Sequence, residues 1–346
     1  MSASGLAASA AGVTLGIDVG GTKVLGVALD GASDAVVAEV KVAAPGRHAR
    51  QRAEEDVPGA LVETLAEVAG RLAQALPAGT VGLDVVGVGL PGLVDDHGVL
   101  RFAPNLPAGA GVPVGEQLAR RLGGARVVVD NDATCAALAE WLLGAARDLS
   151  DMVMVTLGTG IGGGVVAGGR VVRGANGFAA EIGHMVVDPS GPLCPCGKRG
   201  CWERYASGSG LGRLARDAAH AGRLDAVVRA AGGDPEAVRG EHVTAAAAAG
   251  DPEAGAVLDD LGWWLALGLA NLAAVLDPAA FVLGGGLSEH LELVLGPARR
   301  AFASLLVDRE YRPEIEIRPA ELGERAGAIG AALAARGESR HHAGGR

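Results

Sequence analysis

The stretch VTLGIDVGGTKVLGVAL, from Val13 to Leu29, decides the expected fold. Its apolar run from Val13 to Val19 stops at Gly20-Gly21-Thr22-Lys23, after which strand character resumes at Val24. The pattern predicts a hairpin with a glycine turn. A second unit of the same kind reads MVMVTLGTGIGGGVV from Met152 to Val166, so we expect the chain to use this hairpin device twice.

Strand and helix patterns alternate around these hairpins. Apolar residues recur at helical spacing from Leu61 to Leu76, and short buried strands are expected near Val85, Arg126 and Phe281. Such alternation is typical of an α/β fold with a largely parallel core sheet. A chain of 346 residues is longer than most single cores sustain, so we expect two lobes of ordinary domain size.

Charge and hydropathy exclude several classes of function. The formal net charge is −10 and Lys and Arg form no stripe, so neither nucleic acid nor an anionic membrane is an expected partner, and a small molecule is favoured. The apolar stretch from Leu261 to Leu276 is shorter than the roughly 20 residues of a membrane span, which indicates a buried helix. Residues 1–11 lack the basic start and apolar core of a signal peptide, which favours a cytoplasmic location.

Three glycine clusters are candidates for phosphate binding, because glycine turns present backbone N–H groups without side-chain obstruction. They lie at Gly20–Lys23, at Gly158–Gly164 and at Gly284–Gly286. The middle cluster also matches the dinucleotide fingerprint, but that motif must open a helix, and here the glycines lead into Val165. No Gly-Lys-Ser or Gly-Lys-Thr sequence closes a cluster, which excludes a Walker P-loop. Any one cluster alone can be a tight turn, whereas their repetition favours a nucleotide site.

Two aspartates beside these elements are candidates for chemistry. Asp18, just before the first turn, is placed either to meet a phosphate-bound Mg²⁺ or to bond its own turn. Asp130-Asn131-Asp132 follows a predicted strand and precedes a helix, at the sheet edge where α/β folds bind ligands. Asp132 is either the base that accepts a hydroxyl proton in phosphoryl transfer or simply the N-cap of the helix. The amide of Asn131 is suited to hydrogen-bond sugar hydroxyls.

A cysteine-rich loop gives the most specific metal signal. Ten residues after His184 the chain reads Cys194-Pro-Cys196-Gly-Lys-Arg-Gly-Cys201, followed by Trp202 and Glu203. One histidine and three cysteines make the closed tetrahedral set of a structural zinc site. The alternative is that these are small packing residues that lie close together by accident. Zinc would stiffen the loop so that Glu181 and Glu203 point into one pocket, and otherwise both are ordinary surface charges.

Taken together in this order, the motifs resemble those of the ROK family, and within it the ATP-dependent glucokinases. The resemblance runs from about residue 13 to about residue 335. It rests on five motifs: Asp18-Val-Gly-Gly-Thr-Lys23, Asp130-Asn-Asp-Ala-Thr134, the turn at Gly158–Gly164, Glu181-Ile-Gly-His184 and Cys194-x-Cys-Gly-x-x-Gly-Cys201-Trp-Glu203.

The resemblance implies an actin-like (ribonuclease H-like) two-lobed fold and ATP-dependent phosphorylation of glucose to glucose 6-phosphate. It implies ATP, Mg²⁺ and a structural Zn²⁺ as cofactors, Asp132 as general base, and a homo-oligomer, either a dimer or a tetramer. The sugar contacts that it implies are Gly92, Asn105, Asn131, Asp132, Glu181, His184 and Glu203, with His184 also a zinc ligand. The nucleotide contacts that it implies are Asp18, Gly20, Gly21, Thr22, Lys23, Thr159, Gly160, Gly284 and Gly285.

The same reasoning divides the chain into parts. We expect a disordered segment over residues 1–12 and a smaller α/β lobe over 13–130, completed by a C-terminal helix near 325–336. We expect a larger α/β lobe with the zinc-binding loop over 131–324 and a loose tail over 337–346.

Three alternatives remain open at this stage. A kinase for fructose, mannose or N-acetylmannosamine would keep every catalytic part and alter only the pocket wall. Some ROK members are sugar-responsive repressors with a helix-turn-helix domain before the first hairpin, but here that hairpin begins near residue 13, and the acidic charge does not favour DNA. Polyphosphate-dependent glucokinases look different around the first hairpin and lack the cysteine cluster.

Overall fold

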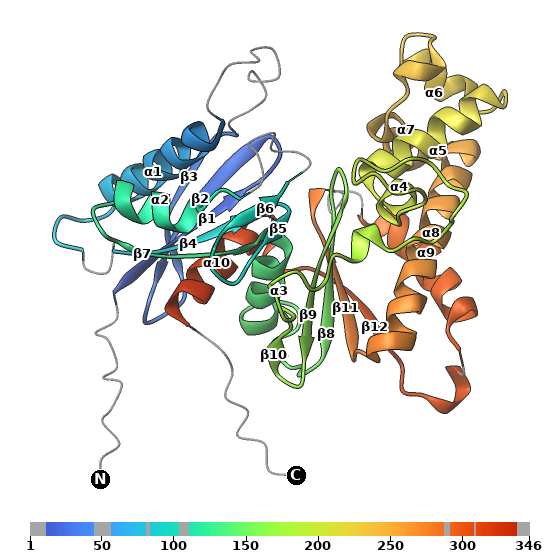
Figure 1. The fold of residues 1–346 in the computed structure, drawn as a ribbon. Helices are drawn as coiled ribbons and strands as arrows, with labels where there is room; N and C mark the ends of the chain where they lie inside the picture. The colour runs from blue at the N-terminus through green and yellow to red at the C-terminus, as the bar shows by residue number, and fades with distance from the viewer. Residues whose placement is uncertain are drawn as a thin grey trace. The chain divides into compact units, whose positions relative to one another are not determined.

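A computed structural model describes residues 12–44, 57–80, 84–103, 111–286, 291–307 and 309–337 (Figure 1). The predictions of a disordered start, of a loose end from 338 onward and of a sugar contact at Asn105 fall on residues outside these ranges. The chain divides into two compact units, each described by itself below. Unit 1 comprises residues 1–139, 174–178 and 325–339, and unit 2 comprises 140–173, 179–324 and 340–346. The sequence-based domain boundaries stay a prediction.

Unit 1 is built on a five-stranded sheet with the strand order β3-β2-β1-β4-β7. Strands β1, β2 and β3 form an antiparallel meander, whereas β4 and β7 run parallel to β1. The first predicted hairpin is therefore present, but the sheet is mixed, because the meander supplies half of its pairings. The strands are β1 Val13–Val19, β2 Lys23–Asp30, β3 Val36–Ala43, β4 Val85–Leu90 and β7 Arg126–Asn131, with a small β5 Leu93–Val94 and β6 Leu100–Phe102 pair beside them.

Helices cover both faces of this sheet. On one face Gly26 lies against α1, where an added Cβ would come within 2.4 Å of Val68. On the other face Gly16 and Gly87 lie against the backbone of α10, where an added Cβ would come within 2.0 and 1.8 Å of carbonyl oxygens. The faces are opposite because Gly16 pairs with Val27, the neighbour of Gly26, and successive residues of a strand alternate. The helices of unit 1 are α1 Val57–Ala75, α2 Val114–Arg121, the start of α3 Asp132–Leu142, and α10 Ala326–Arg336.

Unit 2 repeats the same sheet plan with the strand order β10-β9-β8-β11-β12. Strands β8, β9 and β10 are antiparallel, and β11 and β12 run parallel to β8. The second predicted hairpin is thus present, and the two sheets share one topology. The strands are β8 Met152–Leu157, β9 Ile161–Ala167, β10 Arg170–Val171, β11 Ala280–Gly284 and β12 Glu316–Pro319.

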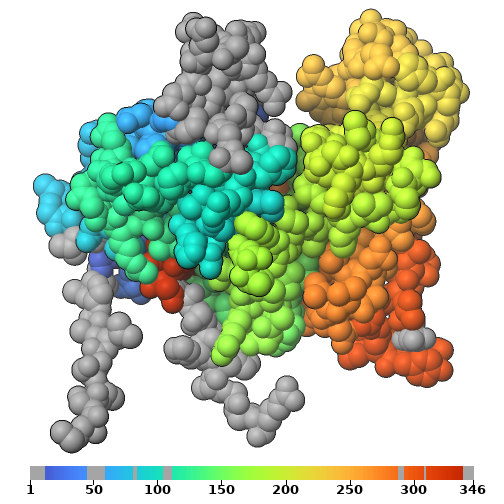
Figure 2. Space-filling model, in the orientation of Figure 1, coloured from blue at the N-terminus to red at the C-terminus, as the bar shows by residue number. Residues whose placement is uncertain are grey.

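A large helical layer packs on one face of the unit 2 sheet. Its core joins Val153, Val155 and Phe281 of the strands to Leu265 and Leu269 of α8. The helices are α4 Glu203–Ala206, α5 Gly208–His220, α6 Asp225–Ala230, α7 Gly240–Ala248, α8 Pro252–Leu276 and α9 Leu291–Leu305, and unit 2 also has the 3₁₀ turns η2 Ile182–His184, η3 Pro235–Ala237, η5 Arg309–Tyr311 and the start of η6 Gly323–Arg325. The yellow residues of α6 and α7 gather in one area of the surface (Figure 2).

The long apolar helix expected around Leu261 is α8, which begins at Pro252 behind the N-cap Asp251. Leu261, Leu265 and Leu269 are buried in the core of unit 2. Among the helices that the structure describes, none combines the length and apolarity that a bilayer crossing requires.

Candidate active site

Asp18 occupies the carboxyl end of β1, where it pairs with Gly89 of β4. Two glycines, Gly89 and Gly327, lie against its carboxylate and leave room for it. A Cβ at Gly89 would lie 3.3 Å from Asp18 Oδ1, and a Cβ at Gly327 of α10 would lie 2.6 Å from Asp18 Cγ. The aspartate side chain therefore lies between the sheet and the start of α10.

The Asp18 carboxylate is held in an unfavourable environment for a charge. The residue is partly buried, and its Oδ1 atom is fully buried and has no hydrogen-bond partner among the described residues. Burial first, and then the negative charge of Asp132, raise the pKa of Asp18, whereas Lys23 opposes the shift. A buried carboxylate oxygen without a partner is the donor that a hard cation such as Mg²⁺ prefers, so this position fits that ion.

Asn131 caps α3, although Asp132 was the alternative N-cap. Asn131 Oδ1 accepts a hydrogen bond from the backbone N–H of Thr134 at 2.9 Å, and Asn131 Nδ2 donates to the Gly92 carbonyl at 3.1 Å. Asp132 is the first residue of the helix, and its Oδ1 accepts from the Ala133 N–H at 2.8 Å. Because Asn131 performs the capping, the interpretation of Asp132 as the cap is wrong. One N–H of the Asn131 amide remains for a ligand.

The first glycine turn is shorter than the sequence suggested, because Lys23 already belongs to β2. The turn at Gly20, Gly21 and Thr22 is closed by a hydrogen bond from the Gly20 N–H to the Lys23 carbonyl at 2.9 Å. Position 92 requires glycine for two reasons. The φ of Gly92 is +103°, and an added Cβ would lie 2.2 Å from the Phe102 carbonyl oxygen. Unit 1 therefore brings together Asp18, the turn, Gly92, Asn131 and Asp132.

In unit 2 the predicted metal ligands lie together. One ligand atom each from His184, Cys194, Cys196 and Cys201 lies within 4.8 Å of the others. Cys196 Sγ and Cys201 Sγ are 3.5 Å apart, and Cys194 Sγ is 3.8 Å from His184 Nδ1. Tetrahedral zinc with bonds of about 2.0–2.3 Å separates its ligand atoms by roughly 3.5–3.8 Å, so this donor set fits zinc. All three cysteines are free thiols.

The loop reaches this geometry through glycines and short backbone bridges. Gly197 and Gly200 have φ values of +88° and +70°, and a Cβ at Gly200 would overlap the Asp188 carbonyl oxygen. The Cys194 N–H donates to the Lys198 carbonyl at 2.8 Å. This hydrogen bond closes the tight turn that separates Cys194 and Cys196 from Cys201. The spacing in the sequence thus specifies a local fold, which is why the sequence alone predicted that these residues lie together.

Glu203 connects the cysteine cluster with the second glycine turn. Its Oε1 accepts a hydrogen bond from the Cys194 thiol at 2.9 Å and lies 3.8 Å from His184 Nδ1. A Cβ at Gly160 would lie 2.4 Å from Glu203 Oε2, so the Glu203 carboxylate lies against this glycine. Burial and the hydrogen bond to Glu203 raise the pKa of the Cys194 thiol. Burial likewise raises the pKa of Glu181, whose Oε2 lies 3.9 Å from His184 Nε2.

The second and third glycine clusters meet at one end of the unit 2 sheet. Gly284 pairs with Thr156 near the end of β8. Gly285, at a φ of +95°, leaves room for the Leu157 backbone, which an added Cβ would approach to 2.7 Å. The turn itself contains Gly158, Thr159 and Gly160, whereas the glycines that follow belong to β9.

Sequence reasoning assigned no role to the residues that hold Glu203 in place. Trp202 is fully buried on Gly268 of α8 and donates to the Trp264 carbonyl at 2.8 Å. Tyr205 stacks on Trp264 and donates to Asp188 Oδ2 at 2.6 Å. The only local signal was the Trp and Tyr that flank Glu203, since their partners are distant in the sequence.

Sequence reasoning also missed Glu140, a fully buried acid in α3. Its carboxylate accepts hydrogen bonds from three backbone N–H groups, those of Ala145, Glu321 and Leu322, at 2.8–3.1 Å. Two of these donors lie far downstream in the chain, so only the tertiary structure reveals them. The carboxylate ties the end of α3 to the segment that follows β12.

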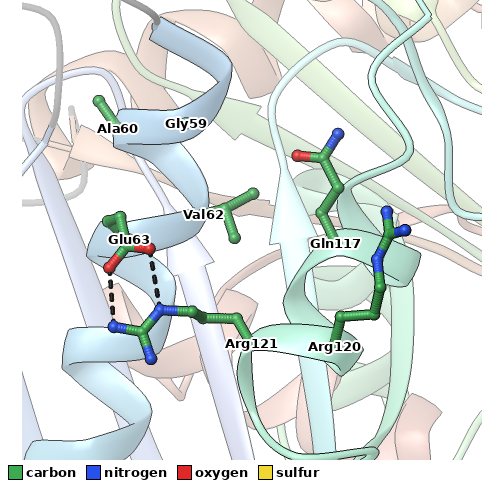
Figure 3. Close-up of a pocket in the computed structure, with 7 residues that line it drawn as sticks. All are labelled: Gly59, Ala60, Val62, Glu63, Gln117, Arg120 and Arg121. Atoms are coloured by element: carbon green, nitrogen blue, oxygen red, sulfur yellow. Dashed lines mark hydrogen bonds and ion pairs between the residues drawn. The ribbon is translucent and has the colours of Figure 1, made fainter.

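A pocket of about 700 Å³ lies elsewhere in unit 1, between α1 and α2 (Figure 3). Glu63 and Arg121 form a two-pronged ion pair at 2.8 and 3.0 Å on one side, and Gln117 and Arg120 extend from α2. None of the predicted site residues lines it. Its wall carries an exposed ion pair, which is typical of a surface depression.

The duplicated sheets, each with a glycine hairpin, define the class of fold as the actin-like (ribonuclease H-like) fold of sugar kinases, as predicted. The ROK family profile matches residues 14–338, and the chain belongs to the ROK family. The chain is 37% identical to the glucokinase of Streptomyces coelicolor (strain ATCC BAA-471 / A3(2) / M145), over 94% of this chain and 98% of that protein. It is 33% identical to the N-acetylmannosamine kinase of Escherichia coli (strain 55989 / EAEC), over 94% and 99%.

Among solved structures, the chain resembles a ROK family glucokinase from Streptomyces griseus in complex with glucose and AMPPNP. The TM-score is 0.81 at 38% sequence identity, and the match covers 94% of this chain and 100% of that one. Membership of the family, predicted from the order of the motifs, is confirmed.

Proposed function

We propose that this protein is an ATP-dependent glucokinase that transfers the γ-phosphoryl group of ATP to glucose and releases ADP and glucose 6-phosphate. The observation that carries the proposal is the similarity over nearly the whole chain to a glucokinase whose structure holds glucose and an ATP analogue. The geometry supports it, because Asn131 caps α3 and Asp132 lies next to it in the first turn of that helix.

In this proposal Asp132 is the general base. It accepts the proton of the sugar hydroxyl as the hydroxyl oxygen attacks the γ-phosphorus, the bond from that phosphorus to the bridging oxygen breaks, and ADP leaves with the bond electrons. Asp132 lies in the first turn of α3, at the positive end of the helix dipole. Asn131, held by Gly92 and Thr134, offers its remaining N–H to a neighbouring hydroxyl.

The other predicted contacts are proposals of the same kind. Glu181, His184 and Glu203 are proposed to bind sugar hydroxyls, together with Gly92 and Asn105. The nucleotide is proposed to contact the Gly20–Lys23 segment, Thr159, Gly160, Gly284 and Gly285. Mg²⁺ neutralises phosphate charge when bound, and Asp18 would hold it directly or through water. Zinc on His184 and the three cysteines would supply rigidity to the loop that carries Glu203.

A cytoplasmic location and a homo-oligomeric state, dimer or tetramer, complete the proposal. Free cysteines in a metal-binding arrangement are typical of a reducing compartment. Size-exclusion chromatography with light scattering measures the oligomeric state.

A second candidate is a kinase for N-acetylmannosamine, favoured by the 33% identity to the Escherichia coli enzyme. The deciding experiment gives the purified protein Mg-ATP with glucose, fructose, mannose or N-acetylmannosamine, and then polyphosphate with glucose, and measures ADP and sugar phosphate. We expect the highest kcat/KM with glucose and ATP. Higher kcat/KM with N-acetylmannosamine would favour the second candidate, and no ADP with any sugar would refute both.

A further inference from the structure

The β8–β9 turn is held from behind by the start of α5. The Gly158 carbonyl accepts a hydrogen bond from the Gly208 N–H at 2.8 Å. The Thr159 carbonyl accepts one from the Ser207 hydroxyl at 3.0 Å and a longer one from the Ser209 N–H at 3.4 Å. Both carbonyls of the turn therefore point toward the first residues of α5.

These contacts fix where the N–H groups of the turn point. In a trans peptide the C=O and the N–H of one unit point in opposite directions. The Thr159 carbonyl shares its peptide unit with the Gly160 N–H, and the Gly158 carbonyl shares its unit with the Thr159 N–H. Both N–H groups must then point away from α5, and neither donates to another group in the described ranges. Two such adjacent donors form a concavity suited to phosphate oxygens.

Ser207 is the side chain at the centre of this arrangement. It is fully buried, and its Oγ accepts from the Gly210 N–H at 3.1 Å as the N-cap of α5. Its single hydroxyl proton is within reach of the Glu203 carbonyl at 2.6 Å and of the Thr159 carbonyl at 3.0 Å, and its Oγ lies 3.0 Å from the Ser209 hydroxyl oxygen. The residue thus links the glycine turn, α4 and α5, and no other described side chain donates a hydrogen bond to the Thr159 carbonyl.

We propose that Ser207 is a positioning residue for the phosphoryl donor, because its hydroxyl sets the direction of the Gly160 N–H that meets a phosphate oxygen. This inference rests on the proposed function as an ATP-dependent kinase. Ser207 does not touch the nucleotide; it acts through the Thr159 carbonyl. Removing its hydroxyl allows the Thr159–Gly160 peptide to rotate, which weakens binding of the triphosphate before it affects the sugar.

The test compares Ser207→Ala and Ser207→Gly with a matched loss of a helix cap. Glycine is tolerated at an N-cap, so Ser207→Gly removes the tether to the turn while it largely spares α5. Asp251 caps α8 by accepting from the Glu253 and Ala254 N–H groups and has no hydrogen bond to the turn, so Asp251→Ala is the control for helix stability alone. The readouts are KM for ATP, KM for glucose, the Kd of AMPPNP by calorimetry, and the melting temperature.

We expect both Ser207 variants to raise KM for ATP and the Kd of AMPPNP by roughly 2- to 12-fold, the effect of one net hydrogen bond. KM for glucose changes less, because Trp202 still anchors Glu203 on α8. Asp251→Ala lowers the melting temperature and leaves both KM values unchanged.

Three results overturn the inference, and they are distinguishable. If the wild-type protein neither binds AMPPNP nor consumes ATP, the proposed function fails and the inference fails with it. If the wild-type protein is active but Ser207→Gly keeps its KM for ATP and its Kd for AMPPNP within the range of Asp251→Ala, the inference alone fails. A rise in KM for glucose equal to that for ATP would also contradict it, since that pattern indicates a general loosening.

Discussion

Replacing Asp18 with asparagine should stabilise the unliganded protein at neutral pH while it impairs the proposed Mg-ATP chemistry. Asparagine has nearly the same shape as aspartate but carries no charge, so it relieves a buried, unpartnered carboxylate oxygen and its repulsion by Asp132. The space between Gly89 and Gly327 accommodates either side chain.

The direction of the pH dependence follows from the raised pKa of Asp18. Burial and the charge of Asp132 raise this pKa from 3.8 to about 8, so between these values the folded protein holds a proton that the unfolded chain has released. The free energy of unfolding therefore falls as pH rises through this window, and it is unaffected below it. A pKa difference of 1 corresponds to about 1.4 kcal/mol, which bounds the effect at pH 7 to roughly 4 kcal/mol. We expect about 2 kcal/mol, because Asp18 is partly exposed and its surroundings can relax.

The assay is thermal and urea unfolding of the wild type and of Asp18→Asn at several pH values from 4 to 8, without nucleotide. At pH 4 to 5 we expect the two proteins to differ little, and at pH 7 to 8 we expect the variant to melt roughly 3 °C higher. Asp96→Asn is the control, because its carboxylate is 65% exposed, and it should show no such trend. A variant that is less stable than the wild type at pH 8, or a difference that does not depend on pH, would refute this explanation of Asp18.

Three further predictions address the base, the metal and the packing. Asp132→Asn should keep the melting temperature and sugar binding while kcat falls by a factor on the order of 10² or more, and near wild-type turnover would contradict the role of base. Cys196→Ala should lose zinc, measured by elemental analysis of the purified protein, because three ligands cannot complete the tetrahedron. The control Cys135→Ala, which replaces a buried cysteine of α3 outside this group, should retain it. Gly87→Ala should destabilise unit 1 by about 3 kcal/mol or more, because the new Cβ would lie 1.8 Å from a carbonyl oxygen of α10. Gly70→Ala, in open space on α1, should be neutral or slightly stabilising, and equal melting temperatures for the two glycine variants would rule out the packing argument.

The features that the sequence predicted are those whose partners lie close along the chain. The cysteine loop folds through contacts between residues a few positions apart, so its spacing was sufficient to predict that its cysteines lie together. The two hairpins were predicted for the same reason, because each is a strand, a glycine turn and a strand in direct succession.

The features that were missed depend on distant segments or on single-residue boundaries. The cap of α3 falls to Asn131 and not to Asp132, a difference of one position that helix patterns do not resolve. The environment of Asp18 depends on Gly327, and the hydrogen bonds of Glu140 depend on Glu321 and Leu322, so no local pattern reveals them. A largely parallel sheet was expected, but both sheets are mixed, because an antiparallel meander begins each unit. The alternation of helices and strands does not indicate that meander.

The shared topology of the two sheets makes two positions equivalent. In each sheet the second-last residue of the first hairpin strand faces a glycine on the neighbouring parallel strand: Asp18 faces Gly89, and Thr156 faces Gly284. The backbone pairing around both positions is the same, so the two positions differ in the chemistry of one side chain. Aspartate places a carboxylate at the first position, and threonine places a neutral hydroxyl at the second.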